Sequence, residues 1–359
     1  MARDLTLWFV MHVLAPRKEI IDIPGYLATT FSGKGKGIYL REVLFPESLF
    51  VNIENYFAEE NKLKEVYFAA KLFGYKHGLI SHLPTLKNGR KEFEIGYKMF
   101  NKYVSTIFAR RLDLEIDYST ETFHYTGDNF IICRKNGIGV IFTGGMAGLV
   151  SYYLSKNAEA KHVYCQGRGD KLCEWISKPL SNDTSLFEKI SVSPDYIKIN
   201  KNSITAKRAE YLSLKDAING RLFFYKEGTL SYKNERHIIW EANIFYFLDR
   251  YCNAKLLFES AYNAGMGIAR KNNWSLELFR LYLSLAGVGL PFFAENNKKV
   301  YVYLKGYPWT ELAKDSTFAI WRGFISGCLS AILDRRVMFN AYSSSFGREG
   351  VFEVVFKEQ

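Results

Sequence analysis

The chain contains an internal repeat, which limits its fold more strongly than any other feature of the sequence. When the 359-residue sequence is shifted by 179 positions, residues 141–176 lie over residues 320–355 without a gap. Identical residues occur at six aligned pairs: Ile141/Ile320, Gly144/Gly323, Gly148/Gly327, Ser151/Ser330, Leu154/Leu333 and Glu174/Glu353. Two glycines and one apolar helix face coincide in this alignment, so we predict two copies of one structural unit.

Both halves show the same predicted order of elements: a strand or hairpin, two helices, a third helix, a strand, a helix and a final hairpin. In the first half the pattern predicts a hairpin at 20–42 with bends at Gly33, Gly35 and Gly37, helices at 46–57, 63–73, 93–108 and 145–153, strand-like segments at 129–134 and 139–142, and a hairpin at 162–176. In the second half, the Gly289-Leu-Pro291 stretch interrupts the third helix. Residues 181–202, rich in Ser, Asn and Lys, predict a linker between a unit at 1–180 and a unit at 203–359.

The final hairpin of the first half carries side chains that suit a metal ion. His162, Cys165 and Cys173 surround a tight turn at Gly167-Arg168-Gly169-Asp170. The two arms of such a hairpin lie about 5 Å apart, so one ion can reach ligands on both. Thiolate and imidazole are typical zinc ligands, and a thiolate-rich set at a hairpin indicates a structural site.

The same residues carry a resemblance to a known family. Gly144-x3-Gly148, followed by His162-x2-Cys165-x-Gly167-x-Gly169-Asp170-x2-Cys173-x-Trp175, resembles the 4-vinyl-reductase domain. The resemblance covers most of residues 30–177 and, in degenerate form, 220–356. It implies an α/β (α+β) fold, similar to the small subunits of TRAPP tethering complexes and to haem-nitric-oxide-binding domains. Each unit would then be a small antiparallel sheet packed with helices, and the two units would pair as a pseudo-dimer.

The resemblance also implies a set of metal ligands. Sensor members of the family hold zinc with one acidic residue and three cysteines, and these positions fall on His162, Cys165, Cys173 and Gly139. Gly139 has no side chain to offer, and Cys133 lies six residues earlier, about 20 Å away along an extended strand. Three ligands plus water, a fourth ligand from Cys133, and no metal at all are each consistent with the sequence. The second copy has Ala341, Ser344 and Phe352 at the matching positions, so we expect no metal there.

Two further groups of residues are candidates for structural or binding roles. The glycine pairs Gly144/Gly148 and Gly323/Gly327 allow another backbone to approach their helices closely. In the family, that helix borders an internal cavity, and the nearby aromatic candidates for a ligand pocket are Phe142, Tyr152, Tyr153 and Trp321.

Composition narrows the class of protein. A net charge of +11 without a block of five basic residues indicates a basic but ordinary surface. Five cysteines in a long chain do not form a disulfide framework, and the acidic Asp4 does not suit a secretory signal, so we expect a cytoplasmic protein. The uncharged segment at 136–155 is poor in bulky apolar residues, so we expect no membrane span. No phosphate-binding loop or nucleophile motif identifies a catalytic residue.

The leading hypothesis is a sensor or regulatory protein that binds a small apolar or aromatic molecule and holds a structural zinc ion in its first unit. A DNA-binding transcription regulator is the first alternative, because the chain is basic and the resembled family serves in transcription regulation. A reductase and an assembly scaffold are further alternatives, and the chain could form a homo-oligomer.

Overall fold

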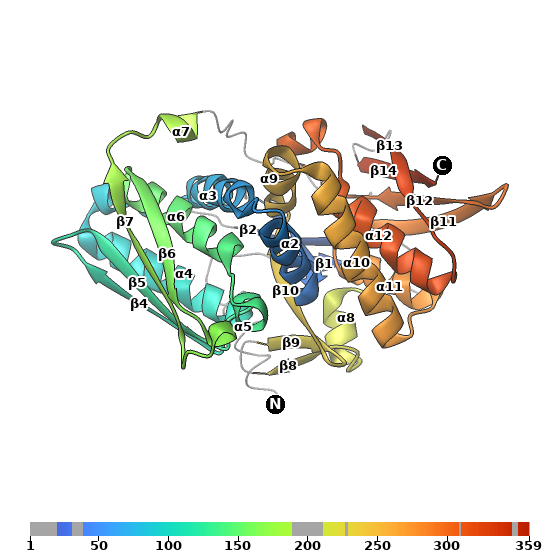
Figure 1. The fold of residues 1–359 in the computed structure, drawn as a ribbon, viewed down its shortest axis with the longest axis horizontal. Coiled ribbons are helices and arrows are strands. Elements are labelled where there is room, and N and C mark those ends of the chain that lie inside the picture. The colour runs from blue at the N-terminus through green and yellow to red at the C-terminus, as the bar shows by residue number, and fades with distance from the viewer. Residues whose placement is uncertain are drawn as a thin grey trace.

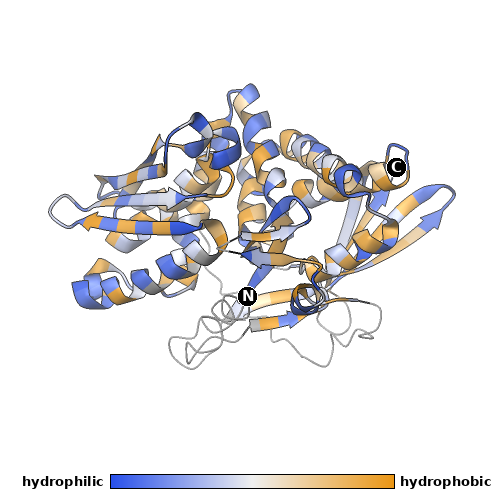
Figure 2. Cartoon of the chain, turned by 90° about the horizontal axis from the view of Figure 1, so that it is seen from below, coloured by the Kyte–Doolittle hydropathy of each residue, from blue (hydrophilic) through white to orange (hydrophobic). Residues whose placement is uncertain are grey.

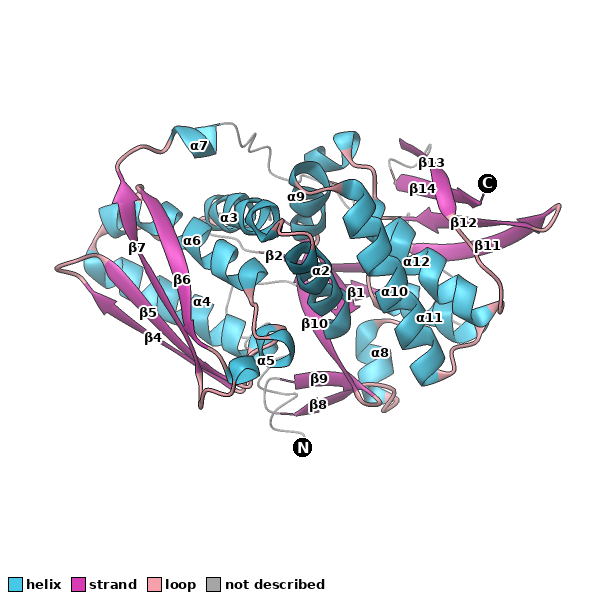
Figure 3. Ribbon diagram, in the orientation of Figure 1, coloured by secondary structure: helices cyan, strands magenta, loops and turns pink. Residues whose placement is uncertain are grey.

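A computed structural model of the chain describes residues 20–30, 39–188, 211–226, 229–308, 310–346 and 351–358. Helices and antiparallel sheets make up the mixed α/β fold that the sequence predicts (Figure 3). The three predicted bend glycines Gly33, Gly35 and Gly37 and most of the predicted linker lie outside the described residues. Within the described residues, no helix has both the length and the apolar character needed to cross a bilayer.

Two four-stranded antiparallel sheets lie at opposite ends of the molecule (Figure 1). The first has the order β4-β5-β7-β6 and consists of β4 (Arg111–Asp117), β5 (Thr122–Asp128), β6 (Asn157–Tyr164) and β7 (Cys173–Ser181). The second has the order β11-β12-β14-β13 and consists of β11 (Leu290–Asn296), β12 (Lys299–Lys305), β13 (Phe339–Phe346) and β14 (Phe352–Glu358). Each sheet therefore pairs its four strands in the same sequential order.

A third sheet joins the two halves of the chain. It has the order β1-β2-β3-β10-β9-β8 and consists of β1 (Ile20–Ile23), β2 (Tyr26–Thr30), β3 (Tyr39–Pro46), β8 (Phe224–Lys226), β9 (Thr229–Tyr232) and β10 (Glu235–Glu241). At its centre β3 pairs antiparallel with β10, and Glu42 lies opposite Glu241. Each half thus contributes three strands to one shared sheet.

The helices fill the space between the sheets. In the first half they are α2 (Glu47–Glu59), α3 (Leu63–Ile80), η1 (Leu86–Asn88), α4 (Arg90–Phe108), α5 (Cys133–Asn136), α6 (Val140–Leu154), η2 (Gln166–Arg168) and α7 (Ser185–Glu188). In the second half they are α8 (Leu214–Asn219), α9 (Asn243–Tyr251), α10 (Ala254–Asn272), α11 (Leu276–Leu285), η3 (Glu311–Asp315) and α12 (Ala319–Ile332). Figure 2 shows hydrophobic and hydrophilic residues mixed along the outer strands, as expected for sheets covered by helices on one face.

Three sequence-based predictions of elements are wrong. The segments at 129–134 and 139–142 are not strands: α5 begins at Cys133, and α6 begins at Val140. The third helix of the second half ends at Leu285, and the stretch after Gly289 is a strand, β11, rather than the continuation of that helix. A short apolar run does not distinguish a buried strand from a buried helix, which explains the error before α6.

The glycine pair of α6 lets this helix contact the backbone of α3. A Cβ atom placed on Gly144 would lie 2.3 Å from the carbonyl oxygen of Tyr67. A Cβ atom on Gly148 would lie 1.8 Å from the carbonyl oxygen of Lys71. These distances are far below van der Waals contact, so any larger residue would force the helices apart.

The glycine pair of α12 makes the equivalent crossing with α10. A Cβ atom on Gly323 would lie 2.3 Å from the carbonyl oxygen of Phe258, and one on Gly327 would lie 1.9 Å from that of Tyr262. The pair α6 and α3 and the pair α12 and α10 therefore pack through corresponding residues. The repeat in the sequence corresponds to a repeated helix crossing in the structure.

The serine that is identical in the two halves, Ser151 and Ser330, also has the same role in both. The Ser151 hydroxyl accepts a hydrogen bond of 2.8 Å from the amide of Ala158, at the start of β6. The Ser330 hydroxyl accepts one of 2.8 Å from the amide of Val337, just before β13. Each serine satisfies a backbone group at the turn from helix to strand, which would otherwise be buried without a partner.

A buried histidine makes the stability of the fold depend on pH. His237 on β10 is 1% exposed and packs edge-on against Phe223. Burial lowers its pKa from 6.5 to about 4. Between pH 6.5 and 4 the unfolded chain therefore binds more protons than the folded chain, and stability falls as the pH falls through this window. By the usual conversion this loss amounts to about 3 kcal/mol.

We expect His237→Phe to remove this component of the acid sensitivity. Chemical denaturation at pH 7, 6, 5 and 4 should show a steeper loss of unfolding free energy for the wild type than for the variant. Parallel curves for the two proteins would contradict the prediction.

Candidate metal centre

Four potential ligands converge at the end of the first outer sheet. They are Cys133 at the start of α5, His162 on β6, Cys165 just after β6 and Cys173 at the start of β7. Their ligand atoms all lie within 4.8 Å of one another, and the three cysteines are buried. A tetrahedral zinc site with Zn–S bonds of about 2.3 Å has edges of about 3.8 Å, so the cluster has the size that a metal ion requires.

The histidine is held in the tautomer that a metal ligand needs. Its Nδ1 lies 3.0 Å from the carbonyl oxygen of Ile138, so Nδ1 carries the proton and donates it to this acceptor. The Nε2 atom is therefore left with its lone pair, and it is buried without a hydrogen-bond partner among the described residues. The ring stacks on Trp175 with a centroid distance of 4.6 Å and an interplanar angle of 9°. An orphaned, fixed lone pair beside three sulfur atoms fits a metal ligand.

The three thiols form one coupled group. The Sγ atoms of Cys133 and Cys173 lie 3.4 Å apart, and all five cysteines of the chain are free thiols. Hydrogen bonding with Cys133 lowers the pKa of Cys165 and that of Cys173. The same hydrogen bonds, together with burial, raise the pKa of Cys133. Two of the three sulfur atoms thus favour the thiolate form, which is the form that binds metal.

Cys133 reaches the cluster because the chain does not run straight between positions 133 and 139. The short helix α5 ends at Asn136, and Gly137 follows in a left-handed conformation with φ of 72°. Gly139 follows with φ of 66°, again in the left-handed region. A Cβ atom on Gly139 would lie 2.7 Å from the Cβ atom of Cys133, so the cysteine occupies the place that a side chain at 139 would take. Cys133 thus lies beside the other three side chains, and the four together could hold a metal ion.

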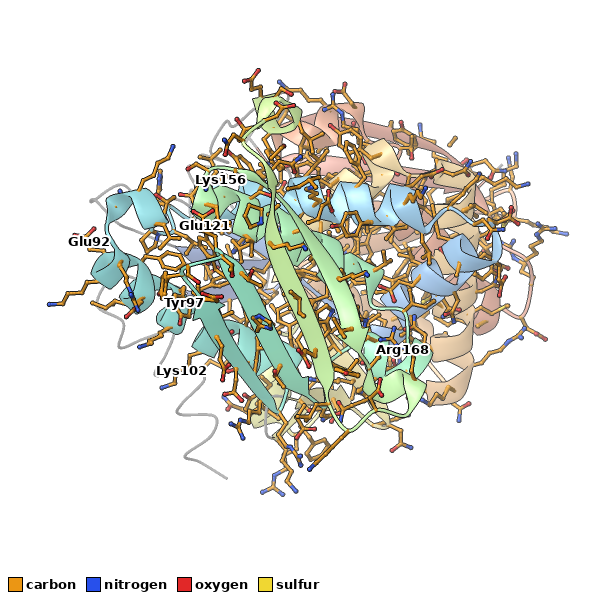
Figure 4. All side chains as sticks on the ribbon, turned by 60° about the vertical axis from the view of Figure 1, so that its left-hand side comes forward. Glu92, Tyr97, Lys102, Glu121, Lys156 and Arg168 are labelled. Atoms are coloured by element: carbon orange, nitrogen blue, oxygen red, sulfur yellow. The ribbon has the colours of Figure 1, made fainter. Side chains whose placement is uncertain are left out.

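The turn between β6 and β7 closes over the cluster. The Asp170 carboxylate accepts a hydrogen bond of 2.7 Å from the amide of Cys165, and the amide of Gln166 donates to the sulfur of Cys173 over 3.4 Å. Arg168 lies at the turn end of this hairpin (Figure 4) and donates to the carbonyl oxygens of Val163 and Gly137 over 3.0 Å and 3.3 Å. These bonds fix the hairpin and the α5 loop in one arrangement, which positions the ligands.

Two buried carboxylates of α2 support the segment from Ile132 to the start of α6, and sequence reasoning missed both. Glu54 is fully buried and accepts hydrogen bonds of 2.9 Å from the amides of Gly139 and Ile141. Glu47 is also fully buried and accepts a bond of 2.7 Å from the amide of Ile132. Burial raises the pKa of Glu54. The carboxylate caps the amino end of α6, where a negative charge is favourable.

We expect Glu54→Gln to weaken metal binding without removing a ligand. An amide cannot accept hydrogen bonds at both of its terminal atoms, so one backbone amide of the segment would lose its partner. The expected results are a fall in metal affinity of roughly tenfold or more and a loss of about 2 kcal/mol in unfolding free energy. Competition titration with a chromophoric chelator measures the first, and denaturant titration measures the second.

Glu59→Gln is the matched control for this prediction, because Glu59 is exposed on the same helix. It should leave both quantities unchanged. Wild-type metal affinity and stability in the Glu54 variant would show that this carboxylate does not position the site.

In the second half, aromatic rings lie where the first half has the cluster. The 179-residue alignment places Phe318 over Gly139 and Phe352 over Cys173. Phe318 has the same left-handed backbone as Gly139, with φ of 53°. Its ring packs 6.5 Å from that of Phe352 and 5.5 Å from that of Tyr307. The second unit therefore fills with carbon the space that the first unit gives to sulfur and nitrogen.

A cavity of about 70 Å³ lies where α3, α4 and α6 meet the shared sheet. Residues of α3, α4, α6, β3, β4, β5 and β10 form its wall: Leu40, Glu42, Phe73, Gly74, His77, Phe100, Asn101, Val104, Phe108, Leu112, Tyr125, Phe142, Gly145, Met146, Leu149, Ile239, Trp240 and Glu241. The lining is mainly apolar, with a few polar side chains. The cavity is therefore built by both halves of the chain, since β10 belongs to the second.

The structure places one of the four aromatic pocket candidates in this wall. Phe142 lines the cavity. Tyr152 packs against Tyr75 and donates a hydrogen bond of 2.8 Å to the carbonyl oxygen of Leu83. Tyr153 is buried 5.1 Å from the ring of Phe93, and Trp321 packs in the second half. These last three do not line the cavity.

No protein-family model matches the chain, and no curated protein matches it. The site is therefore defined by its geometry: three cysteines and one histidine that could hold a metal ion, and a mainly apolar cavity.

Proposed function

We propose that this protein is a small-molecule-binding sensor or regulatory protein with a structural zinc ion in its first unit. Its two units would be related to the 4-vinyl-reductase domain and paired as a pseudo-dimer. The observation that carries the proposal is the convergence of Cys133, His162, Cys165 and Cys173, with the His162 Nε2 buried and unpartnered among the described residues. Three thiolates and one imidazole form a ligand set typical of structural zinc sites.

The position of the cluster supports a role in shaping the cavity. His162 stacks on Trp175, and the Trp175 ring lies 4.9 Å from that of Phe142, which lines the cavity. A row of rings thus connects a metal ligand to the cavity wall. Zinc at the cluster would hold this row and the amino end of α6 in place.

The second half also contacts the segment that carries Cys133. Arg236 on β10 donates a hydrogen bond of 2.8 Å to the carbonyl oxygen of Asn129, and Lys135 lies 3.6 Å from Glu235. Because β10 also lines the cavity, a ligand there would contact an element shared between the halves. A change in that contact would carry a signal between the two units.

Native mass spectrometry of the purified chain tests the proposal. We expect one zinc ion per chain and the mass of a bound small organic molecule, which mild activation should release before the zinc. A correctly folded chain that carries neither metal nor small molecule would contradict the proposed function.

A further inference from the structure

A comparison of the two copies of the repeat indicates why the cavity is present. The 179-residue alignment places Gly145 of α6 over Phe324 of α12. Phe324 is fully buried, 5.9 Å from the ring of Trp321. Gly145 lines the cavity, and a Cβ atom added to it would meet nothing within 4 Å. The second unit therefore has a large side chain at the position where the first unit leaves space.

The alignment of these two positions is supported by the helix that crosses them. A Cβ atom on Gly74 of α3 would lie 2.0 Å from the carbonyl oxygen of Gly145. A Cβ atom on Gly265 of α10 would lie 2.2 Å from the carbonyl oxygen of Phe324. Gly145 and Phe324 thus occupy the same point of the same helix crossing. A space of about 70 Å³ is larger than a water molecule needs and is unusual within an otherwise close-packed interior, so it is a candidate site for a molecule of only a few heavy atoms.

The polar groups of the cavity wall include two carboxylates. Glu42 on β3 and Glu241 on β10 lie opposite each other in the shared sheet and are 5% and 3% exposed. The Thr29 hydroxyl donates to Glu42 over 3.0 Å, and the Nδ1 of His77 lies 2.6 Å from a carboxylate oxygen of Glu241. Burial acts to raise the pKa of Glu241, but the hydrogen bond and charge of His77 and the charge of Lys76 outweigh it and lower the pKa. Glu241 is therefore an anion at neutral pH.

The rest of the wall is rich in aromatic rings. Six of its residues are aromatic: Phe73, Phe100, Phe108, Tyr125, Phe142 and Trp240. The faces of such rings attract cations, and carboxylates attract them more strongly. His77 already pairs with Glu241, so a ligand carboxylate would find no free cation among the named wall residues and would lie beside the Glu241 anion, which repels it.

We propose that the cavity binds a small organic ammonium ion, with its apolar body among the aromatic rings and its charged nitrogen toward Glu42 and Glu241. This inference rests on the proposed function and names the chemical class of its ligand. The ammonium group donates hydrogen bonds to carboxylate oxygens, and the apolar body fills the space beside Gly145. Since one carboxylate comes from each half, the ligand would bridge β3 and β10.

Three probes with one carbon skeleton test the ligand class on the full-length chain: isobutylamine, isobutanol and isobutyrate. Calorimetry and ligand-observed NMR at pH 7 should show binding of isobutylamine at least tenfold tighter than that of isobutanol, with isobutyrate not bound. Glu42→Gln should weaken isobutylamine binding tenfold or more and reduce its preference over isobutanol.

Gly145→Phe tests the location, because it copies the second unit. It should abolish isobutylamine binding while the thermal midpoint stays at or above that of the wild type. Gly267→Phe is the matched control: Gly267 is an exposed helical glycine whose added Cβ would also meet nothing within 4 Å, and it does not line the cavity. This control should bind isobutylamine as the wild type does.

Each remaining outcome overturns the inference. Isobutylamine binding that survives in folded Gly145→Phe places the amine elsewhere, and equal binding of isobutyrate removes the role of the carboxylates. Isobutanol binding that depends on Gly145, without binding of the amine, refutes the ammonium class but leaves the proposed small-molecule function standing. Failure of all three probes to bind refutes the ammonium proposal, and the mass-spectrometric search for a bound molecule then decides the proposed function separately.

Discussion

Replacing Cys173 with serine should remove the metal from the protein and lower its unfolding free energy by more than about 4 kcal/mol. Cys173 is fully buried, its Sγ lies 3.4 Å from that of Cys133, and it shares the cluster with His162. A serine hydroxyl is a poor zinc ligand, so the remaining groups would be buried beside an incomplete site. In small zinc-finger peptides, zinc binding contributes about 10 kcal/mol or more to the free energy of folding, so a loss above about 4 kcal/mol is within the range expected for a structural zinc ion.

Metal analysis and denaturant titration measure this result together. The wild type should carry one zinc ion per chain, and the Cys173→Ser protein should carry none. A chelator added to the wild type should reproduce the loss of stability, because both treatments empty the same site. Chelation should not destabilise the variant further.

Cys252→Ser is the control for the chemistry of the substitution. Cys252 is also a buried free thiol, but it follows α9 in the second half and is not part of the cluster. This variant should keep its zinc and most of its stability. A Cys173 variant with full metal content, or a chelated wild type of unchanged stability, would show that the cluster does not hold a structural metal.

The proximity of three of the four candidate ligands could be predicted, because these three are local in the sequence. His162, Cys165 and Cys173 belong to one hairpin, and a hairpin fixes the distance between its arms whatever the rest of the chain does. The register in which His162 lies opposite Trp175 follows from that hairpin. The close packing at the glycine pairs of α6 and α12 could also be predicted, since the glycines recur at the same positions in both halves.

The fourth ligand could be named but not placed, because its position depends on two unusual backbone conformations. The apolar run before Cys133 is compatible with a buried strand as well as with the observed turn into α5. Gly137 and Gly139 adopt left-handed conformations that glycine permits but does not require. The contacts from Glu47 and Glu54 that hold this segment come from a helix 85 residues earlier, and no local pattern reveals them.

The cavity could not be predicted from the sequence, for a related reason. Its two carboxylates lie on strands almost 200 residues apart, which meet only because β3 pairs with β10. One signal was nevertheless present in the repeat, since Gly145 stands where the second copy has Phe324. Likewise Gly139 stands where the second copy has Phe318. In each case the first unit has a glycine beside its cluster or its cavity, where the second has an aromatic core residue.

Gly148→Ala should destabilise the protein by about 3 kcal/mol, the upper part of the usual range for overpacking. The added methyl group would lie 1.8 Å from the carbonyl oxygen of Lys71 and 2.7 Å from the amide nitrogen of Tyr75. Both contacts are backbone atoms of α3, so a side-chain rotation cannot relieve them and the helices must separate. Because α6 carries part of the cavity wall and begins beside the metal centre, the variant should also lose metal affinity.

Gly145→Ala, three residues away on the same helix, should have the opposite effect. Its methyl group would meet nothing within 4 Å, and alanine in a helix interior is roughly 0.5–1 kcal/mol more favourable than glycine. Denaturant titration of the two variants compares the same chemical change at a tight crossing and at an open wall. If Gly148→Ala and Gly145→Ala lower the unfolding free energy equally, the difference in their surroundings has no effect on stability. The glycine pair of α6 would then not be needed for the close contact with α3. A stable Gly148→Ala protein would refute the repeated crossing as the element that organises each half.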